Sequence, residues 1–427
     1  MTTLKYYKLS ELYEMSSGIS SKPEQAGHGM PFCSFTTVFN NYILPAELPD
    51  KMDTSAKEQE ACTLKTGDVL LTRTSETLDE LGMSSVALKD YPNATFSGFL
   101  KRLRPKHADI VYPKYFAFYL RSRTFRQAMN NNAVMTLRCS LNEQIFSYLD
   151  VLLPSFDQQR MIGDFLFQIY AKIELNNQIT SQLEGMAKLL YDYWFVQFDF
   201  PMSASQANAL GMPQLAGKPY RASGGKMVFN ETLKREIPDG WEMKALDDIC
   251  QSVRDSVDPA NVDPATPYVG LEHVPRRQFF LDAWDPASSV KSLKSRFIKG
   301  DVLFGKLRPY FHKVVRVDME GICTSELLVL RSRHAKHEAL LGSVVFSDQF
   351  VESTAKQWGG AQMPRADWNR MKKFQLPVPS DDLLKDFNAF VLPLWKLGGS
   401  NQKQNQELTR LRDWLLPMLM NGQVTVG

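Results

Sequence analysis

The chain has 427 residues, which is long for a single hydrophobic core and favours two or more domains. Hydrophobic residues make up 44% of it and charged residues 23%, a composition that excludes a disordered chain. Its formal net charge of +3 is only mildly basic, so a nucleic-acid-binding surface would have to arise from local clustering of Lys and Arg.

The cysteines and the apolar segments indicate a reduced, cytoplasmic protein. The five cysteines are an odd number and include no C-x-x-C pair, which argues against a disulfide framework and against a cysteine zinc site. The first residues lack the basic-then-apolar pattern of a secretory signal. No stretch approaches the apolar length that spans a bilayer.

The first globular segment covers residues 1–155 and mixes strands with helices. The run Val69–Thr72 is typical of a buried strand, and residues 112–129 have helical character. A first helical spacer follows at 156–200, where apolar residues recur at three- and four-residue steps. About forty helical residues would form a rod of about 60 Å. Its amide run Asn176–Gln178 either fixes the register of a helix pair or faces solvent.

The second half of the chain repeats this order. Residues 201–237 are rich in Pro, Gly, Ser and Ala and are typical of an irregular connector. A second globular segment at 238–379 contains the strand-like run Leu327–Leu330, and a second helical spacer occupies 380–427. Because Pro393 and the pair Gly398-Gly399 fall inside that spacer, we expect a kink or two helical pieces near residues 393–400.

Short matching segments occur in the same order in both halves, which indicates an internal duplication. Gly67-Asp68-Val69-Leu70 is matched by Gly300-Asp301-Val302-Leu303, each in a similar extended setting. Further matches lie upstream and downstream: Pro31-Phe32 with Pro267-Tyr268, Lys8–Leu12 with Ala245–Ile249, and Leu152-Leu153-Pro154 with Gln375-Leu376-Pro377. Each match is weak, but the shared order predicts two copies of one domain.

The ordered set of motifs resembles the specificity subunits of type I restriction–modification systems. The residues that carry the resemblance lie in both halves: Glu174–Gln178, Tyr193–Val196, Ile237–Glu242, Tyr268–His273, Gly300–Tyr310 and Gln362–Arg365. The similarity implies an α+β chain in which two mixed α/β target-recognition domains are joined by two long antiparallel coiled-coil-like helical regions, as a pseudo-twofold internal repeat.

The resemblance also implies a function and partners. Each recognition domain would read one half of a bipartite, asymmetric site in double-stranded DNA. The helices would set the spacer and dock two adenine-N6 methyltransferase subunits, which carry S-adenosylmethionine. A motor–nuclease subunit would cut unmodified DNA. The specificity subunit itself would hold no cofactor and no metal and would catalyse no reaction. Pro393 and the pair Gly398-Gly399 of the second spacer depart from the straight helix that the resemblance implies.

Cationic residues near the matched strands are the candidates for DNA contact, because Arg and Lys bind phosphates and Arg can read guanine with two hydrogen bonds. In the second domain they are Lys306, Arg308 and Lys313, with aromatic residues between them. In the first domain they are Arg73, Lys101, Arg102 and Arg104. Arg138 and Arg365 precede the last strand of each domain and complete the set. The alternative is that these charges are solvated surface residues.

Enzyme activity finds no support in the motifs. The chain has no (N/D)-P-P-(Y/F) motif, which an adenine methyltransferase would need, and no G-x-x-x-x-G-K-(S/T) phosphate loop. A two-domain scaffold that binds proteins alone is the main rival hypothesis. A fragment of a fused restriction–methylation enzyme is a second one.

Overall fold

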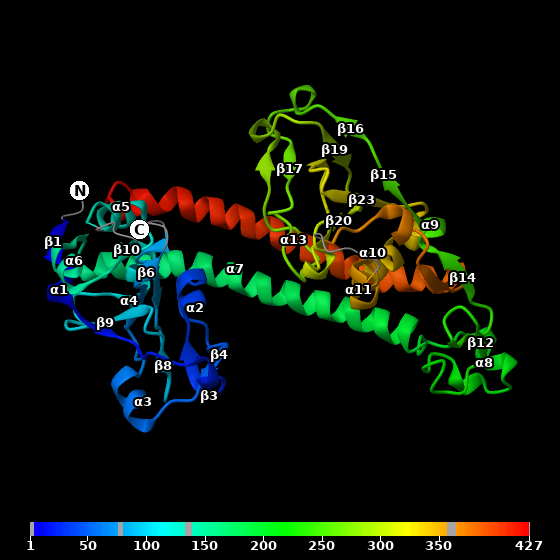
Figure 1. Ribbon diagram of the computed structural model, residues 1–427, viewed down its shortest axis with the longest axis horizontal. Coiled ribbons are helices and arrows are strands. Elements are labelled where there is room, and N and C mark those ends of the chain that lie inside the picture. Colours follow the sequence, from blue (N-terminus) through cyan, green and yellow to red (C-terminus); the bar gives the residue numbers. More distant parts are fainter. Residues whose placement is uncertain (1–3, 76–79, 133–138, 357–363, 427) are drawn as a thin grey trace. The chain divides into compact units, whose positions relative to one another are not determined.

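A computed structural model describes residues 4–75, 80–132, 139–356 and 364–426 (Figure 1). Its contacts divide the chain into two compact units. Unit 1 consists of Met1–Lys172 together with Leu408–Gly427, and unit 2 of Ile173–Glu407. Two long helices, α7 (Phe156–Tyr191) and α13 (Asp381–Met420), contribute residues to both units. Within the described residues, no helix is both long and apolar enough to cross a membrane.

Unit 1 combines two small sheets with short helices. One sheet has the strand order β2-β9-β5-β7, the other has the order β4-β3-β8, and β1 pairs separately with β11. The strands are β1 (Lys5–Lys8), β2 (Tyr13–Ser17), β3 (Ala26–Cys33), β4 (Asp50–Met52), β5 (Val69–Thr72), β6 (Thr74–Ser75), β7 (Ser84–Val86), β8 (Thr95–Phe96), β9 (Leu100–Pro105), β10 (Cys139–Ser140) and β11 (Asp150–Leu153). The helices are α1 (Leu9–Leu12), α2 (Phe35–Asn40), α3 (Ala56–Cys62), α4 (Pro113–Tyr119), α5 (Arg123–Asn132) and α6 (Glu143–Tyr148).

The main core of unit 1 lies between the β2-β9-β5-β7 sheet and the helices. The apolar sequence of α4 places Tyr115, Phe116 and Phe118 in this core, where none is more than 1% exposed. The beginning of α7 and the end of α13 pack into the same cluster through Leu166 and Leu419. The helical character predicted for residues 112–129 is confirmed by α4 and α5.

Unit 2 has the same kinds of element. A four-stranded sheet has the order β15-β23-β20-β21, a five-stranded sheet has the order β16-β19-β22-β17-β18, and β14 pairs with β24. The strands are β14 (Glu242–Ala245), β15 (Cys250–Val253), β16 (Ser256–Val257), β17 (Pro267–Val269), β18 (Asp285–Pro286), β19 (Lys294–Phe297), β20 (Val302–Gly305), β21 (Val314–Arg316), β22 (Gly321–Cys323), β23 (Leu327–Ser332) and β24 (Gln375–Val378). The helices are α9 (Leu246–Ile249), α10 (Glu338–Phe346), α11 (Asp348–Lys356) and α12 (Trp368–Met371).

The predicted duplication is confirmed by strand pairing. In unit 1, β5 lies between β9 and β7, both antiparallel to it, and in unit 2, β20 lies between β23 and β21 in the same way. The matched Pro-aromatic segments lie in strands that each have one parallel partner: β3 pairs with β8, and β17 pairs with β22. The first and last strands of each copy pair with one another, β1 with β11 and β14 with β24. The mixed α+β class is therefore confirmed.

A buried aspartate explains why the Gly-Asp-Val-Leu motif recurs. Asp68 and Asp301 are 0% and 1% exposed. Each carboxylate accepts two hydrogen bonds from one guanidinium: Arg104 to Asp68 at 2.8 and 2.6 Å, and Arg331 to Asp301 at 2.8 and 2.8 Å. Each also accepts the backbone N–H three residues earlier, at 2.8 Å. The preceding Gly67 and Gly300 have φ of 89° and 92°, a left-handed turn that favours glycine.

In unit 2 the two long helices are antiparallel and are joined by an amide layer. Asn176 is fully buried, and its Nδ2 donates to Gln404 Oε1 at 2.8 Å and to Asn405 Oδ1 at 2.9 Å. Asn405 in turn donates to Asn177 Oδ1 at 2.8 Å. Of the two interpretations of the amide run, the buried polar layer is therefore correct for Asn176. Such a layer fixes the register of a helix pair, since any shift would leave buried amides unpaired.

Of the two alternatives expected near residues 393–400, the two helical pieces are wrong, because α13 is one continuous helix. The kink stays a prediction. Pro393 costs one backbone hydrogen bond. The cost is offset by burial of the flanking Phe387, Val391 and Trp395, which are at most 2% exposed. Gly398 has a packing role instead of a breaking one: a Cβ at this position would lie 2.5 Å from the Phe280 ring.

The segment 201–237, expected to be irregular, contains a short helix, α8 (Ala204–Ala209), and leads into a hairpin of β12 (Met227–Asn230) and β13 (Arg235–Pro238). It is anchored by aromatic stacking, with the Phe200 ring 4.6 Å from Tyr220 and 5.3 Å from Trp241. The segment therefore packs on the core of unit 2.

We predict that Asp301→Ala lowers the free energy of unfolding by about 2–4 kcal/mol, because it leaves a guanidinium and a backbone N–H without their partner. The matched control is Asp247→Ala, which removes a half-exposed pair with Arg333 and should cost about 0–1 kcal/mol. Urea unfolding, with hydrogen exchange of the β20 amides, measures both. Equal losses in the two variants would contradict the structural role of Asp301.

We also predict that Asn176→Ala lowers the free energy of unfolding by about 1–3 kcal/mol, because buried Asn405 loses a partner. The double variant Asn176→Leu with Asn405→Leu removes both buried amides and should be at least as stable as the unmodified chain. The same urea titration compares them. If the double variant is as unstable as the single one, the unpaired buried amide is not the cause of the lost stability.

Candidate nucleic-acid interface

Three predicted cations of unit 2 gather at the end of strand β20. Lys306 directly follows the strand, and the backbone of the next residue, Leu307, bridges to Arg365. The backbone N–H of Arg308 donates to Pro364 O at 2.9 Å, and that of Ala366 donates to Lys306 O at 2.8 Å. The segment before the last strand therefore lies against the cationic loop, which we define as residues 306–312.

The charged groups of this cluster differ in how firmly they are held. Arg365 is paired with Glu326 at 2.6 Å, although its side chain remains 52% exposed. Lys306 donates to Ser325 O, and its partial burial lowers the pKa of its ammonium. Arg308 is partly exposed and contacts the Phe311 ring at 5.7 Å. Arg308 and Arg365 are thus the more accessible cations.

An aromatic group completes the cationic loop. Tyr310 is 50% exposed, and its ring lies 5.0 Å from that of Phe311. The Phe311 ring also lies 3.9 Å from the guanidinium of Arg276, an exposed residue that sequence reasoning missed. Arg276 and Arg277 are adjacent in the sequence, and this pair of cations is the signal that could have found Arg276.

Lys313 is turned toward the protein. Its Nζ donates to Leu271 O at 2.6 Å, and burial lowers the pKa of this ammonium. This contact lies within unit 2 and uses the group that would otherwise reach a phosphate. Its contact with DNA stays a prediction.

In unit 1, Arg73 holds the position that corresponds to Lys306. Its backbone N–H donates to Phe99 O at 2.8 Å, and its carbonyl accepts from Leu141 at 2.8 Å. As in unit 2, this residue contacts the segment that precedes the last strand of its unit, here β11. Next to this contact, β6 pairs with β10. Its guanidinium donates to Gly98 O at 3.4 Å, beside Phe99, which is 62% exposed. Arg138 lies outside the described residues.

The other three candidates of unit 1 have partners inside the fold. Lys101 is 9% exposed and donates to Ser17 Oγ at 2.7 Å, and burial lowers the pKa of its ammonium. Arg102 is 7% exposed and donates to Thr63 O at 2.7 Å. Arg104 binds buried Asp68, as Arg331 does with Asp301. Charge density in the sequence selected these residues, but it cannot tell which face of a strand they occupy. Their contact with DNA stays a prediction.

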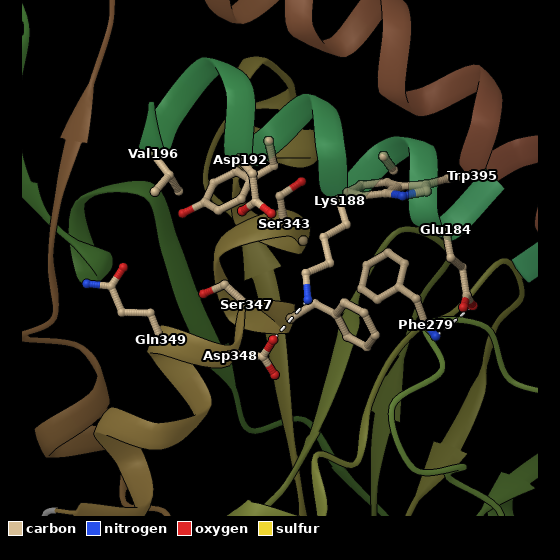
Figure 2. Close-up of a pocket in the computed structure, with 14 residues that line it drawn as sticks. Glu184, Lys188, Asp192, Val196, Phe279, Ser343, Ser347, Asp348, Gln349 and Trp395 are labelled. Carbon is tan, nitrogen blue, oxygen red and sulfur yellow. Dashed lines mark hydrogen bonds and ion pairs between the residues drawn. The ribbon is translucent and has the colours of Figure 1, made fainter. Parts of the chain in front are cut away.

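A cavity that the sequence did not indicate lies beside the interface in unit 2, with a volume of about 250 Å³ (Figure 2). Phe279, Phe346 and Trp395 form apolar walls. Glu184 accepts the backbone N–H of Phe279 at 2.8 Å, and burial raises the pKa of its carboxyl. Lys188 and Asp348 form an ion pair at 2.9 Å at this cavity, as Figure 2 shows.

No group of three or more His, Cys, Asp and Glu side chains is placed to hold a metal ion in the part of the chain that the structure describes. The described cysteines Cys33, Cys62, Cys250 and Cys323 are buried and unpaired, and burial raises the pKa of each thiol. The chemistry that the interface offers is therefore cationic and aromatic contact with an anionic partner.

Comparison with known proteins gives this surface a context. Residues 1–185 match a family model described as the type I restriction modification DNA specificity domain. The HindI specificity subunit of Haemophilus influenzae is 24% identical over 99% of this chain and 100% of its own length. The MjaIX specificity subunit of Methanocaldococcus jannaschii is 23% identical over 80% of this chain and 75% of its own length.

A solved structure shares the fold. The S subunit of a type I restriction–modification system from M. genitalium aligns with a TM-score of 0.58 at 11% identity, over 98% of this chain and 96% of that one. The similarity thus extends over both units, beyond the part that the family model matches. The chain is thus similar to type I restriction–modification specificity subunits over nearly its whole length, and residues 1–185 match the model of their DNA specificity domain.

Proposed function

We propose that each unit reads one half of a bipartite, asymmetric DNA site for a type I restriction–modification complex. The observation that carries the proposal is the duplicated frame, in which equivalent strands β5 and β20 end at cationic residues Arg73 and Lys306. Two copies of one reading frame suit two half-sites. Because the residues that follow the two strands differ, the two half-sites would differ in sequence.

We propose that the paired helices set the spacer between half-sites and dock the two methyltransferase subunits. The amide layer around Asn176 supports a fixed register between α7 and α13. Both helices also carry large apolar side chains that this chain leaves exposed: Met186 51%, Leu189 69%, Phe390 56%, Leu397 49% and Trp414 65%. Exposed apolar surface of this kind is typical of a protein interface.

The chain itself would catalyse no reaction. S-adenosylmethionine would be held by the methyltransferase subunits, and a motor–nuclease subunit would cut unmodified DNA. The similarity to type I restriction–modification specificity subunits supports these assignments, as does the absence of cofactor motifs in the sequence. Under the rival hypothesis of a protein-only scaffold, the cationic loop would have no effect on DNA affinity.

We predict that Lys306→Gln with Arg308→Gln weakens DNA binding by the assembled methyltransferase complex about 10- to 100-fold, through the loss of two contacts. The slope of log affinity against log salt should fall by about 2. Fluorescence anisotropy over a salt series measures both quantities. The control, Lys226→Gln with Lys234→Gln, removes the same charge from two lysines that are at least 70% exposed. Unchanged affinity in the Lys306→Gln with Arg308→Gln variant would favour the scaffold, and equal loss in the control would contradict a defined DNA site at the cationic loop.

We predict that methylome sequencing of a host carrying this chain with its methyltransferase reveals one motif with two specified segments and an unspecified gap. Insertion of four helical residues after Lys172 and four after Glu407, at the boundary of the two units, should lengthen only the gap. Four residues add about 6 Å, which corresponds to about 2 base pairs. A continuous motif, or an insertion that changes the bases read, would refute the proposal.

A further inference from the structure

Strained backbone gathers at the cationic loop. Among the described residues, six that are not glycine have a left-handed φ, and three of these belong to this site: Arg277 at 56°, Arg308 at 49° and His312 at 53°. Arg308 and His312 flank the 3-10 turn Pro309–Phe311, and the N–H of Arg277 donates to His312 O at 3.0 Å. Such conformations persist only where surrounding groups hold them, and they cluster at functional sites.

The groups that bind these strained residues lie at the junction of α10 and α11. His312 is 3% exposed, and its Nε2 donates to Phe346 O at 2.8 Å. Two residues later, Asp348 Oδ1 accepts a hydrogen bond from the guanidinium of Arg277 at 3.0 Å and lies 3.5 Å from His312 Nδ1. The other carboxylate oxygen of Asp348 is bound by Lys188 of α7 at 2.9 Å. One short segment therefore fixes two of the three strained residues.

The groups that this arrangement presents can read bases. Arg308 and Arg276 lie against the ring of Phe311, at 5.7 and 3.9 Å, and Tyr310 projects beside it, half-exposed. A guanidinium that stacks on a ring keeps its planar fork free for guanine, and an exposed aromatic ring can contact a base face or a thymine methyl. Base reading needs such groups within about 0.5 Å of the productive geometry.

We propose that Asp348 is a positioning residue for DNA recognition by unit 2. It would not touch DNA itself. By holding Arg277, whose backbone N–H binds His312 O, it keeps the cationic loop in the one conformation in which Arg308 and Tyr310 meet the base edges. This inference rests on the proposed function. Beyond the proposed function, it makes the specificity for one half-site depend on a carboxylate that does not itself contact DNA.

The test uses the assembled methyltransferase complex and measures methylation of a library in which each base of both half-sites is varied. Asp348→Ala should reduce discrimination about tenfold at one or more positions of the half-site read by unit 2, the size of one lost bidentate contact. Discrimination at the other half-site should be unchanged. Asp348→Glu, which keeps the charge, should restore part of it. Affinity for unrelated DNA should not fall, because the cations remain.

Two further variants keep the proposal falsifiable. Arg277→Gln removes the bound guanidinium from a side chain that is 68% exposed, so the fold is retained even if Asp348→Ala unfolds the chain. It should relax the same half-site. The control, Asp247→Ala, removes a carboxylate of similar exposure that pairs with Arg333 in the same unit and should leave specificity unchanged.

The outcomes separate this inference from the function on which it rests. Unaltered discrimination in both Asp348→Ala and Arg277→Gln, or equal relaxation of both half-sites, would overturn the positioning role while a bipartite motif remained. If the unmodified chain directs no bipartite motif at all, the proposed function itself fails.

Discussion

One buried carboxylate in each unit holds together the frame on which the candidate interface is built. Asp68 and Asp301 each bind a guanidinium from the neighbouring strand and a backbone N–H at the turn before their own strand. A buried charge is tolerated only when it is fully paired. The turn, the strand and its neighbour are therefore fixed together, and the residue that follows the strand is presented at a defined place.

Much of the fold, including the duplication and the first long helix, could be predicted from the sequence. The order of short matches predicted the duplication, because each match marks an element that the fold repeats: a turn glycine with its aspartate, a strand with one parallel partner, or a closing strand. The periodicity of apolar residues found the first long helix. The second was mispredicted at Pro393 and Gly398, because propensity describes an isolated helix. Burial of Trp395 and the close contact of Gly398 with Phe280 are tertiary effects.

The candidate site was less predictable. A run of charges marks cations but not their partners, so Arg104, which binds Asp68, and Arg308, which is partly exposed, look alike in sequence. Arg276 and Asp348 reach the cationic loop from distant segments, and only the folded chain brings them there. Left-handed backbone at Arg277 and Arg308 has no signature in residue type, since glycine, asparagine, aspartate and histidine are the residues that most often adopt it.

The differences between the two copies follow a pattern that an asymmetric DNA site would require. Positions that hold the frame are retained, as with Arg104 and Arg331 in the β9 and β23 strands. The register of those strands aligns Arg102 with Val329, so a side chain that donates to Thr63 O in one copy is replaced by an apolar side chain in the other. Arg73 follows β5 and Lys306 follows β20, and each begins a loop. The residues after these two cations differ between the copies. Retention of the frame with divergence of the loops lets one fold present two different surfaces, as the proposal of two different half-sites requires.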